Sequence, residues 1–228
     1  MDEAGEAMSA LTASMEDIEQ ASQETQKIVK TIDDLVAEFK ARPGEVKVAS
    51  AGVGAGGHLA AETFRKATGV EYRHIPYKGG YPAVVSTVKG ETEVVMQLSM
   101  EVADMLRAKK LRALANMSTQ ALEIDGYGEV PPVMQFIPDH APLQYLFGLY
   151  IPKGTPPEAV ETINKAFDAA AASDSIKRLA KEKASAVVNY KGEEALKLSE
   201  TTGNNVNCIL QEIGIAKKDP AAFGFICK

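Results

Sequence analysis

Residues 46–80 carry the pattern that most limits how this chain can fold. Val46 and Val48 alternate as in a buried strand, and a loop crowded with glycine follows them directly. A helix is expected from about His58, then a second strand over Val70 to Ile75 and another glycine turn. Strand, helix and strand in this order predict a βαβ unit. The expected fold is therefore α/β, with a parallel or mixed sheet covered by helices.

The loop between the first strand and the helix holds Gly52, Gly54, Gly56 and Gly57 within six positions. Glycine costs conformational entropy, so this concentration indicates a tight turn or a close approach of the backbone to another group. The helix that follows has free N–H groups at its start, and these favour a carboxylate or a phosphate. The segment predicts an anion site, with close packing of helix on strand as the alternative reason for the glycines.

The same loop, residues 52–57, formally matches the G-x-G-x-x-G pattern of dinucleotide-binding folds. Those folds also place an acid at the end of the second strand, where it binds the ribose hydroxyls. Here that strand ends in Pro76-Tyr77-Lys78-Gly79-Gly80, without an acid, although Lys78 could accommodate a 2′-phosphate. An NADP-dependent oxidoreductase is therefore kept as the alternative function.

Other enzyme chemistry has little support in the sequence. His58, His74 and His140 lie far apart and show no metal-ligand spacing. His74 is expected as a half-buried sheet residue, and Ser50, the nearest candidate nucleophile, has no identifiable base. With 31 acids, 25 bases and no basic face, nucleic acid is not an expected partner. We expect a protein that performs no chemistry and uses no cofactor or metal.

The rest of the chain alternates expected helices and strands. Helices are expected over 82–88, 100–108, 155–172, 176–183 and 192–213, and strands over 91–98, 111–117, 145–151 and 186–188. Residues 120–144 are expected to form a long irregular loop, because they are rich in Gly, Pro and Asp.

Several motifs follow one another in the order and spacing of a known family over nearly 200 residues. They are Ser50 to Glu62, His74 to Gly80, Lys110 to Ala115, Phe147 to Pro156, and Gly214 to Lys218. On these motifs, residues 33–228 resemble the C-terminal two-thirds of the solute receptors of tripartite tricarboxylate transporters. The resemblance implies a lobe like those of periplasmic binding proteins, a small organic carboxylate as ligand, membrane transporter subunits as partners, and a periplasmic location.

In that family, backbone amides and small side chains of glycine-rich loops meet the ligand carboxylate. The resemblance implies an anion cradle of Ser50, Gly54, Ala55, Gly56, Gly57 and His58, beside a wall of Tyr77, Lys78, Gly79 and Gly80. Many relatives carry an aspartate in a pocket-facing F-D-S pattern where this chain has Met96-Gln97-Leu98-Ser99. Gln97 and Ser99 therefore join the predicted site. Because Gln97 also donates, where aspartate only accepts, we expect a more oxygen-rich or less cationic ligand.

The first 41 residues differ from the rest. Met8, Met15, Ser22, Val29 and Val36 fall seven apart, with Leu11, Ile18, Thr25 and Ile32 three further on, which is a heptad register. Residues 1–33, most clearly 18–33, resemble the signalling coiled coil of methyl-accepting chemotaxis receptors. Residues 1–41 have a net charge of −7 against −6 for the whole chain, so they carry all the net acidity. A homodimer through 1–41, or a coiled-coil interaction module, is a further alternative.

The expected organisation has three parts. An amphipathic helix over 1–41 precedes a ligand-binding lobe over 45–150, and a helical segment over 151–228 would pack on a first lobe that this chain lacks. Three explanations suit the junction between the N-terminal helix and the lobe. They are a natural fusion or truncation, a gene-calling error, and an upstream extension of the receptor's own interlobe helix.

The sequence leaves two possible cellular locations. No secretion signal is recognisable, so a cytoplasmic location is expected if the chain is made as written, against the periplasmic one that the resemblance implies. No run of 18 apolar residues predicts a membrane span. Two free thiols are favoured for Cys208 and Cys227, because a disulfide between them would need an oxidising compartment.

Overall fold

The computed structural model describes residues 31–143 and 145–227. Its centre is a three-stranded parallel sheet in the order β2-β1-β3, formed by Lys47–Ser50 (β1), Arg73–Pro76 (β2) and Val94–Val95 (β3). In the middle strand, Val48 lies opposite His74 on one side and Val94 on the other. Val48 and Ala49 are fully buried, as the central strand of a parallel sheet requires. The α/β fold expected from the sequence is confirmed.

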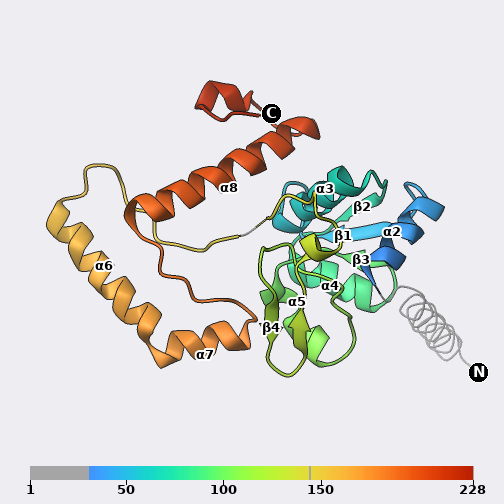
Figure 1. Cartoon of the computed structure of the whole chain (residues 1–228), viewed down its shortest axis with the longest axis horizontal. Coiled ribbons are helices and arrows are strands. Elements are labelled where there is room, and N and C mark those ends of the chain that lie inside the picture. Colours follow the sequence, from blue (N-terminus) through green and yellow to red (C-terminus); the bar gives the residue numbers. More distant parts are fainter. Residues whose placement is uncertain (1–30, 144, 228) are drawn as a thin grey trace, which may run out of the picture.

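A helix follows each of these strands (Figure 1): α3 (Gly56–Thr68), α4 (Gly80–Val88) and α5 (Ser99–Arg107). A further helix, α2 (Ile32–Ala41), precedes β1. The main core lies between the sheet and these helices, and the Phe64 ring of α3 is 1% exposed there, 6.1 Å from the Phe39 ring of α2. The helices expected at 82–88 and 100–108 are confirmed with shifts of one or two residues at their starts.

Helix α2 falls within the segment for which a heptad helix was expected. Residues 1–30 lie outside the described residues, so the structure bears on that expectation only from Thr31 onward. Ile32, a seam position in the heptad, is 4% exposed and packs in the lobe core with Leu35 and Phe39. In this part of the chain, the helix contributes its apolar face to the lobe.

The segment that follows α5 is more regular than expected. Residues 120–144 were expected to be irregular, but Leu122–Ile124 (β4) and Gly128–Val130 (β5) form an antiparallel hairpin, followed by the short helix η1 (Val133–Gln135). The strand expected over 111–117 is wrong apart from one bridge between Asn116 and Pro132. Leu111 and Ala113 of this stretch pack on a second small core under the hairpin, whereas Leu114, Ala115 and Met117 pack on the main core.

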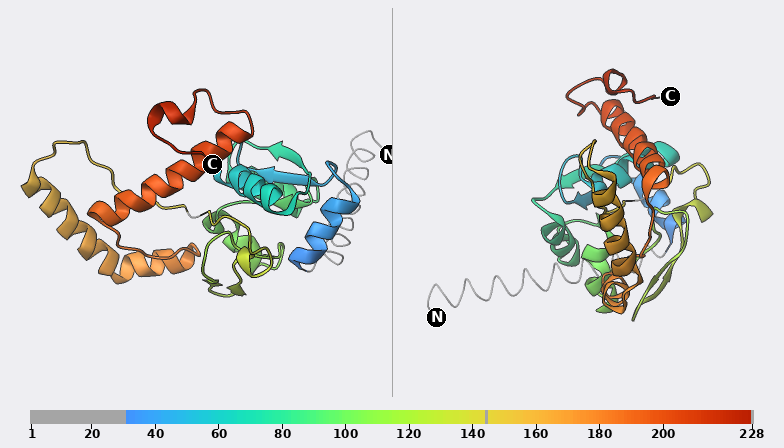
Figure 2. Two further views of the ribbon diagram at one scale, coloured as in Figure 1. Left: turned by 45° about the horizontal axis from the view of Figure 1, so that its top comes forward. Right: turned by 90° about the vertical axis from the view of Figure 1, so that its left-hand side faces the viewer.

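The C-terminal part forms an arm of three helices, α6 (Pro157–Ala172), α7 (Asp174–Glu182) and α8 (Gly192–Glu212), and a short helix η2 (Pro220–Phe223). Figures 1 and 2 show α6 and α7 reaching away from the sheet and α8 returning to it. The helices expected here are confirmed, yet none of their residues is buried. Among the described helices, none has the length and apolar character needed to cross a membrane.

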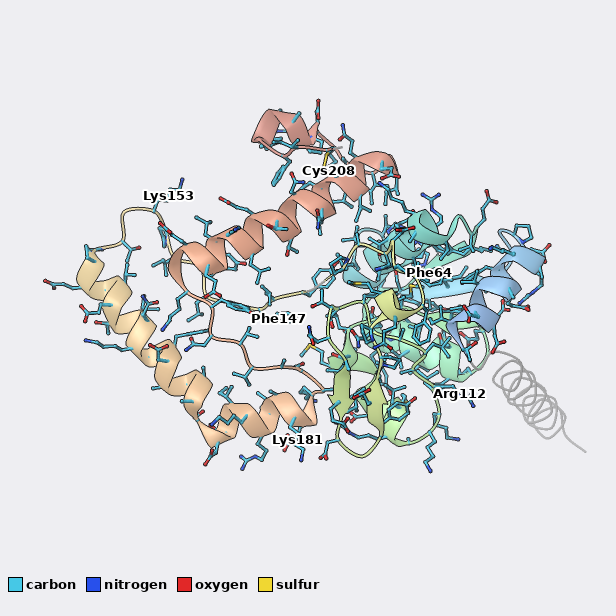
Figure 3. All side chains as sticks on the ribbon, viewed as in Figure 1. Phe64, Arg112, Phe147, Lys153, Lys181 and Cys208 are labelled. Atoms are coloured by element: carbon cyan, nitrogen blue, oxygen red, sulfur yellow. A yellow bond between two sulfur atoms is a disulfide. The ribbon has the colours of Figure 1, made fainter. Side chains whose placement is uncertain are left out.

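The strands expected at 145–151 and 186–188 are wrong. Both segments are extended chain without a pairing neighbour, and Figure 3 shows Phe147 on the connection between lobe and arm. Phe147, Leu149 and Tyr150 are 76%, 71% and 80% exposed. Their apolar sequence suits a strand, but the structure offers no sheet for it to join. These three residues form an exposed apolar surface on this connection.

The expectation of two free thiols is also wrong. Cys208 of α8 and Cys227 form a disulfide, with Cα atoms 5.2 Å apart. The tail is fixed further where the Asn204 side chain accepts from the Ile226 N–H and donates to the Ile226 carbonyl. A disulfide of this kind persists in an oxidising compartment.

Candidate functional site

The carboxyl ends of the three parallel strands meet at one edge of the sheet, where α3, α4 and α5 begin. Because β2 and β3 lie on opposite sides of β1, the direction of winding reverses between β1 and β3. In open parallel sheets, ligands bind outside the carboxyl ends of the strands at such a reversal. The three helix starts direct free N–H groups toward this edge, which favours an anionic ligand.

The start of α3 packs directly on the chain after β3. A Cβ atom on Gly57 would stand 1.7 Å from the Met96 carbonyl oxygen, so only glycine fits there. Gly54 has φ +76°, a left-handed conformation that other residues rarely adopt. Close packing and a tight turn therefore account for part of the glycine content. The same packing brings the start of α3 next to Gln97.

Two buried polar atoms at this edge have no hydrogen-bond partner: Gln97 Nε2 and Tyr145 Oη. The Gln97 amide lies between two helix starts, with Oε1 2.9 Å from the Cβ position of Gly57 and Nε2 2.1 Å from that of Gly80. The Tyr145 ring covers the start of α3, with Oη 3.4 Å from the Cβ position of Gly56. Unpaired buried donors cost free energy and are rare in folded proteins. Both atoms therefore point to a ligand that accepts hydrogen bonds.

An acid lies beside the same two helix starts. The Glu101 Oε1 atom is 2.2 Å from the Cβ position of Gly80, next to the Gln97 amide, and burial raises the pKa of Glu101. Burial also raises the pKa of Tyr145 to about 12, so its hydroxyl keeps its proton at neutral pH. The sequence analysis missed both residues. Glu101 lies in the first turn of α5, two residues after Ser99.

A cavity of about 1150 Å³ opens between this edge of the lobe and the arm. Of the predicted site residues, it is lined by Gly56, Gly57, Gln97 and Ser99. Tyr145 adds to this side, and Phe167, Ile176 and Tyr190 line the side of the arm. The structure therefore joins the α3 and α5 starts in one cavity whose lining is mainly apolar, as in small-molecule sites.

The other predicted site residues do not line this cavity; they are Ser50, Gly54, Ala55, His58, Tyr77, Lys78, Gly79 and Gly80. Two of the amides are used within the chain: the Tyr77 N–H donates to the Ser50 carbonyl at 2.9 Å, and the Gly79 N–H to the Ala51 carbonyl at 3.0 Å. Lys78 is exposed. These residues hold the two glycine loops against each other behind the helix starts.

Ser50 has a neighbour that the sequence did not reveal. Its Oγ lies 2.7 Å from His74 Nε2, so the expectation that Ser50 lacks a base is wrong. Ser50 is nevertheless fully buried, and its Oγ is engaged with the N–H and carbonyl of Gly52. A buried hydroxyl with these partners fixes a loop and offers no approach to a substrate. Among the described residues, no cluster of His, Cys, Asp or Glu is arranged to hold a metal.

The three histidines are held in environments that disfavour their charged forms. Burial is the main cause that lowers the pKa of His58, of His140 and of His74, the last to about 4. His58 and His74 also stack, with ring centroids 4.0 Å apart. Both nitrogens of His140 are buried without a partner.

These lowered pKa values predict acid lability. The unfolded chain binds protons on histidine near pH 6.5, whereas the folded chain resists them. The stability contributed by the neutral rings is therefore full above pH 6.5 and is lost as pH falls toward about 4. Thermal unfolding at steps between pH 7.5 and 4.5 should show a falling midpoint that begins above the carboxylate range. A His140→Leu variant should show a shallower fall, and an equal slope in both proteins would contradict this account.

The sequence profile of the tripartite tricarboxylate transporter family receptor matches residues 20–215. The chain belongs to this receptor family. The resemblance on which the sequence analysis relied is thereby confirmed.

Relatives of this receptor span more chain than is present here. Protein BugT of Bordetella pertussis is 32% identical over 146 residues, which cover 64% of this chain and 44% of BugT. A solved periplasmic transporter structure is 28% identical, with a TM-score of 0.71, over 82% of this chain and 62% of that one. An R. palustris protein solved with adipate shares the fold, with a TM-score of 0.62 at 23% identity, over the same shares of the two chains. The chain therefore spans between 44% and 62% of the length of these proteins.

Membership in the receptor family also bears on the alternative function. The matched family is one of transporter receptors, and the strand end at Pro76 is followed by Tyr77 and Lys78, with no acid for a ribose. The NADP-dependent alternative is not favoured.

Proposed function

We propose that this chain is the ligand-binding lobe of a receptor that captures a small organic carboxylate for a membrane transporter, without chemistry. The observation that carries the proposal is the buried, unpartnered Gln97 Nε2 between the starts of α3 and α4. A carboxylate oxygen placed there would accept from Gln97 and lie at the positive ends of two helix dipoles. Tyr145 Oη supplies a second donor for the other oxygen.

The acid beside this position limits the ligand further. Burial raises the pKa of Glu101, which lies beside this position, and a hydroxyl or an amide of the ligand would pair with its carboxyl group. A dicarboxylate would instead extend toward the apolar side of the cavity, which Phe167 and Ile176 line. Adipate, the ligand in the solved R. palustris relative, has four methylene groups between its carboxylates and is the first compound to test.

A periplasmic site of action suits this function. The Cys208–Cys227 disulfide requires an oxidising compartment, and membrane transporter subunits would collect the ligand there. The chain spans 62% of the solved periplasmic transporter, so weak affinity is expected for this chain alone.

A thermal-shift panel tests the proposal. The full chain is heated with mono-, di- and tricarboxylates, adipate included, and with NADPH. A saturable rise of the unfolding midpoint with one class of acid supports the receptor, since a ligand that binds only the folded state stabilises it. A rise with NADPH alone, or no rise with any acid at millimolar concentration, would contradict the proposal.

The exposed apolar surface on the connection, formed by Phe147, Leu149 and Tyr150, predicts self-association of the isolated chain. In sedimentation, the chain should be heavier than a monomer, and a Phe147→Ser, Tyr150→Ser double variant should approach the monomer mass.

The Met8→Lys variant tests the homodimer expected through residues 1–41 in the same experiment. Ile32 is left unchanged because it lies in the core. A monomer at every concentration would contradict both ideas, and a loss of mass in Met8→Lys alone would favour the coiled coil.

A further inference from the structure

Two stacked histidines lie behind the glycine loop that leads into α3. The His58 and His74 rings are nearly parallel, 8° apart in plane, with centroids separated by 4.0 Å. Each ring is connected to a different part of the loop. The Gly54 N–H donates to His58 Nδ1 at 3.0 Å, and His74 Nε2 contacts Ser50 Oγ, which in turn bonds Gly52. The pair therefore holds the loop at two points.

The bond from Gly54 fixes the protonation of His58. A backbone N–H can only donate, so His58 Nδ1 must be the bare acceptor nitrogen, and the ring proton must lie on Nε2. A second proton on the ring would occupy Nδ1 and face the Gly54 N–H directly. The protonated ring therefore cannot keep this bond.

The bond at His74 responds differently to acid. Ser50 Oγ can donate to the Gly52 carbonyl while it accepts from His74, so a proton on His74 leaves this contact in place. A charged His74 would still repel a charged His58, since the rings stack. His58 is thus the member of the pair whose charge decides the shape of the loop.

The ionisable groups that face His58 are few. On its own helix, Glu62 Oε1 lies 3.7 Å from His58 Nε2, and the same carboxylate accepts from Tyr72 at 2.6 Å and from Arg65 at 2.8 Å. From β2 it faces His74. From the side of α8, the loop meets apolar atoms, the Ile215 and Leu210 side chains at 3.7 Å from the Cβ position of Gly54. Glu62 is thus already engaged, and burial lowers the pKa of His58 and so opposes a charge on its ring.

We propose that His58 is a positioning residue of the ligand site: its neutral ring fixes the loop that starts α3, and protonation releases the loop. Residues 52–57 end at the helix start where the carboxylate is expected to bind, so release would disorder the donors at Gly56 and Gly57. The effect on affinity rests on the proposed function, whereas the effect on the loop does not. The receptor would accordingly release its ligand in acid.

Amide hydrogen exchange of the ¹⁵N-labelled full chain tests the effect on the loop without a ligand. We expect the protection factor of the Gly54 amide to fall at least tenfold between pH 7.5 and 4.5. The amide of Arg73, which donates to the Val46 carbonyl in the sheet, serves as the control and should stay protected.

Two variants distinguish the effect of the hydrogen bond between Gly54 and His58 from the effect of side-chain packing. In His58→Asn the side-chain Oδ1 replaces Nδ1 as acceptor and does not titrate, so Gly54 should stay protected across the pH range. In His58→Gln no acceptor stands at that position, so Gly54 should lose at least tenfold in protection already at pH 7.5. Exchange at Arg73 would show whether the wild-type sheet opens in acid. If it does, the protection of the Gly54 amide in the two variants at pH 7.5 decides whether the His58 bond holds the loop.

Two results would overturn the proposal. One is unchanged protection of the Gly54 amide in wild type at pH 4.5 while the sheet stays intact. The other is unchanged protection of the Gly54 amide in His58→Gln at pH 7.5. The affinity for adipate, or for whichever acid the thermal panel selects, is then measured over the same range and should fall about tenfold in wild type and less in His58→Asn. If Gly54 behaves as expected but no acid binds at any pH, the proposed function fails while the positioning role of His58 stands.

Discussion

Replacing Gly57 with alanine is expected to lower the free energy of unfolding of the lobe by about 3 kcal/mol, the upper end of the usual cost of forcing atoms into a packed core. The new Cβ would stand 1.7 Å from the Met96 carbonyl oxygen and 2.8 Å from its carbonyl carbon. These are backbone atoms next to β3, and the Met96 N–H bonds the Ala49 carbonyl of β1. Relief of the clash therefore requires that the β1–β3 pairing be disturbed.

The neighbouring glycine provides a matched control. A Cβ on Gly56 would meet only the Tyr145 ring, at 3.1 Å, and a side chain can move away where a strand cannot. Gly56→Ala should therefore cost less than about 1 kcal/mol, as most substitutions without a backbone clash do. Urea unfolding followed by circular dichroism measures both variants. Equal stability of Gly57→Ala and wild type would mean that α3 does not start against β3, and the site would lose its geometric basis.

Replacing Gln97 with leucine should weaken carboxylate binding by about 10- to 100-fold, because a hydrogen bond to a charged group contributes about 1.5–3 kcal/mol. The shape of the side chain is nearly preserved, so the loss would come from the Nε2 donor. The same change should leave the free chain as stable as wild type or slightly more stable, since it removes a buried donor that has no partner.

This opposite response of stability and binding is the signature to look for. Gln135→Leu, at an exposed glutamine in η1, controls for a change of glutamine to leucine away from the site. Calorimetric titration with the acid selected by the thermal panel, together with urea unfolding, gives both quantities. Unchanged affinity in Gln97→Leu would remove this residue from the site, and a large loss of stability would show that its amide has a structural partner.

The parts of the fold that the sequence predicted are those decided by nearby residues. Alternating valines, a glycine loop and a helix start lie within residues 46–64, so β1 and α3 could be recognised from local pattern and turn chemistry. The expected strands at 145–151 and 186–188 failed because a strand needs a partner, and the apolar character of these residues says nothing of whether one is present.

The loop motifs predicted residues for the site, and the tertiary contacts around them could not be read from the sequence. Gly56, Gly57, Gln97 and Ser99 were found through their motifs, and the structure brings them to one cavity. The place of Tyr145 above Gly56 depends on a contact across almost 90 residues that no local pattern encodes. The Ser50–His74 contact depends likewise on the register of β1 and β2, which sets Ser50 opposite Pro76 and brings His74 within reach.

The disulfide likewise depends on a tertiary contact that the local sequence does not encode. Cys208 and Cys227 pair because the tail folds back on α8, where Asn204 holds Ile226. Spacing alone does not reveal such a return, so the free-thiol expectation rested on the absence of a motif and failed.

The most direct test of the central claim is an NMR titration of the ¹⁵N-labelled full chain with adipate, or with the acid that the thermal panel selects. The account predicts saturable shifts of the Gln97 side-chain amide and of the Gly56 and Gly57 backbone amides, all with one dissociation constant. Saturable binding that moves resonances elsewhere and leaves these three groups unchanged would contradict the claim that the carboxylate binds where β1 and β3 end.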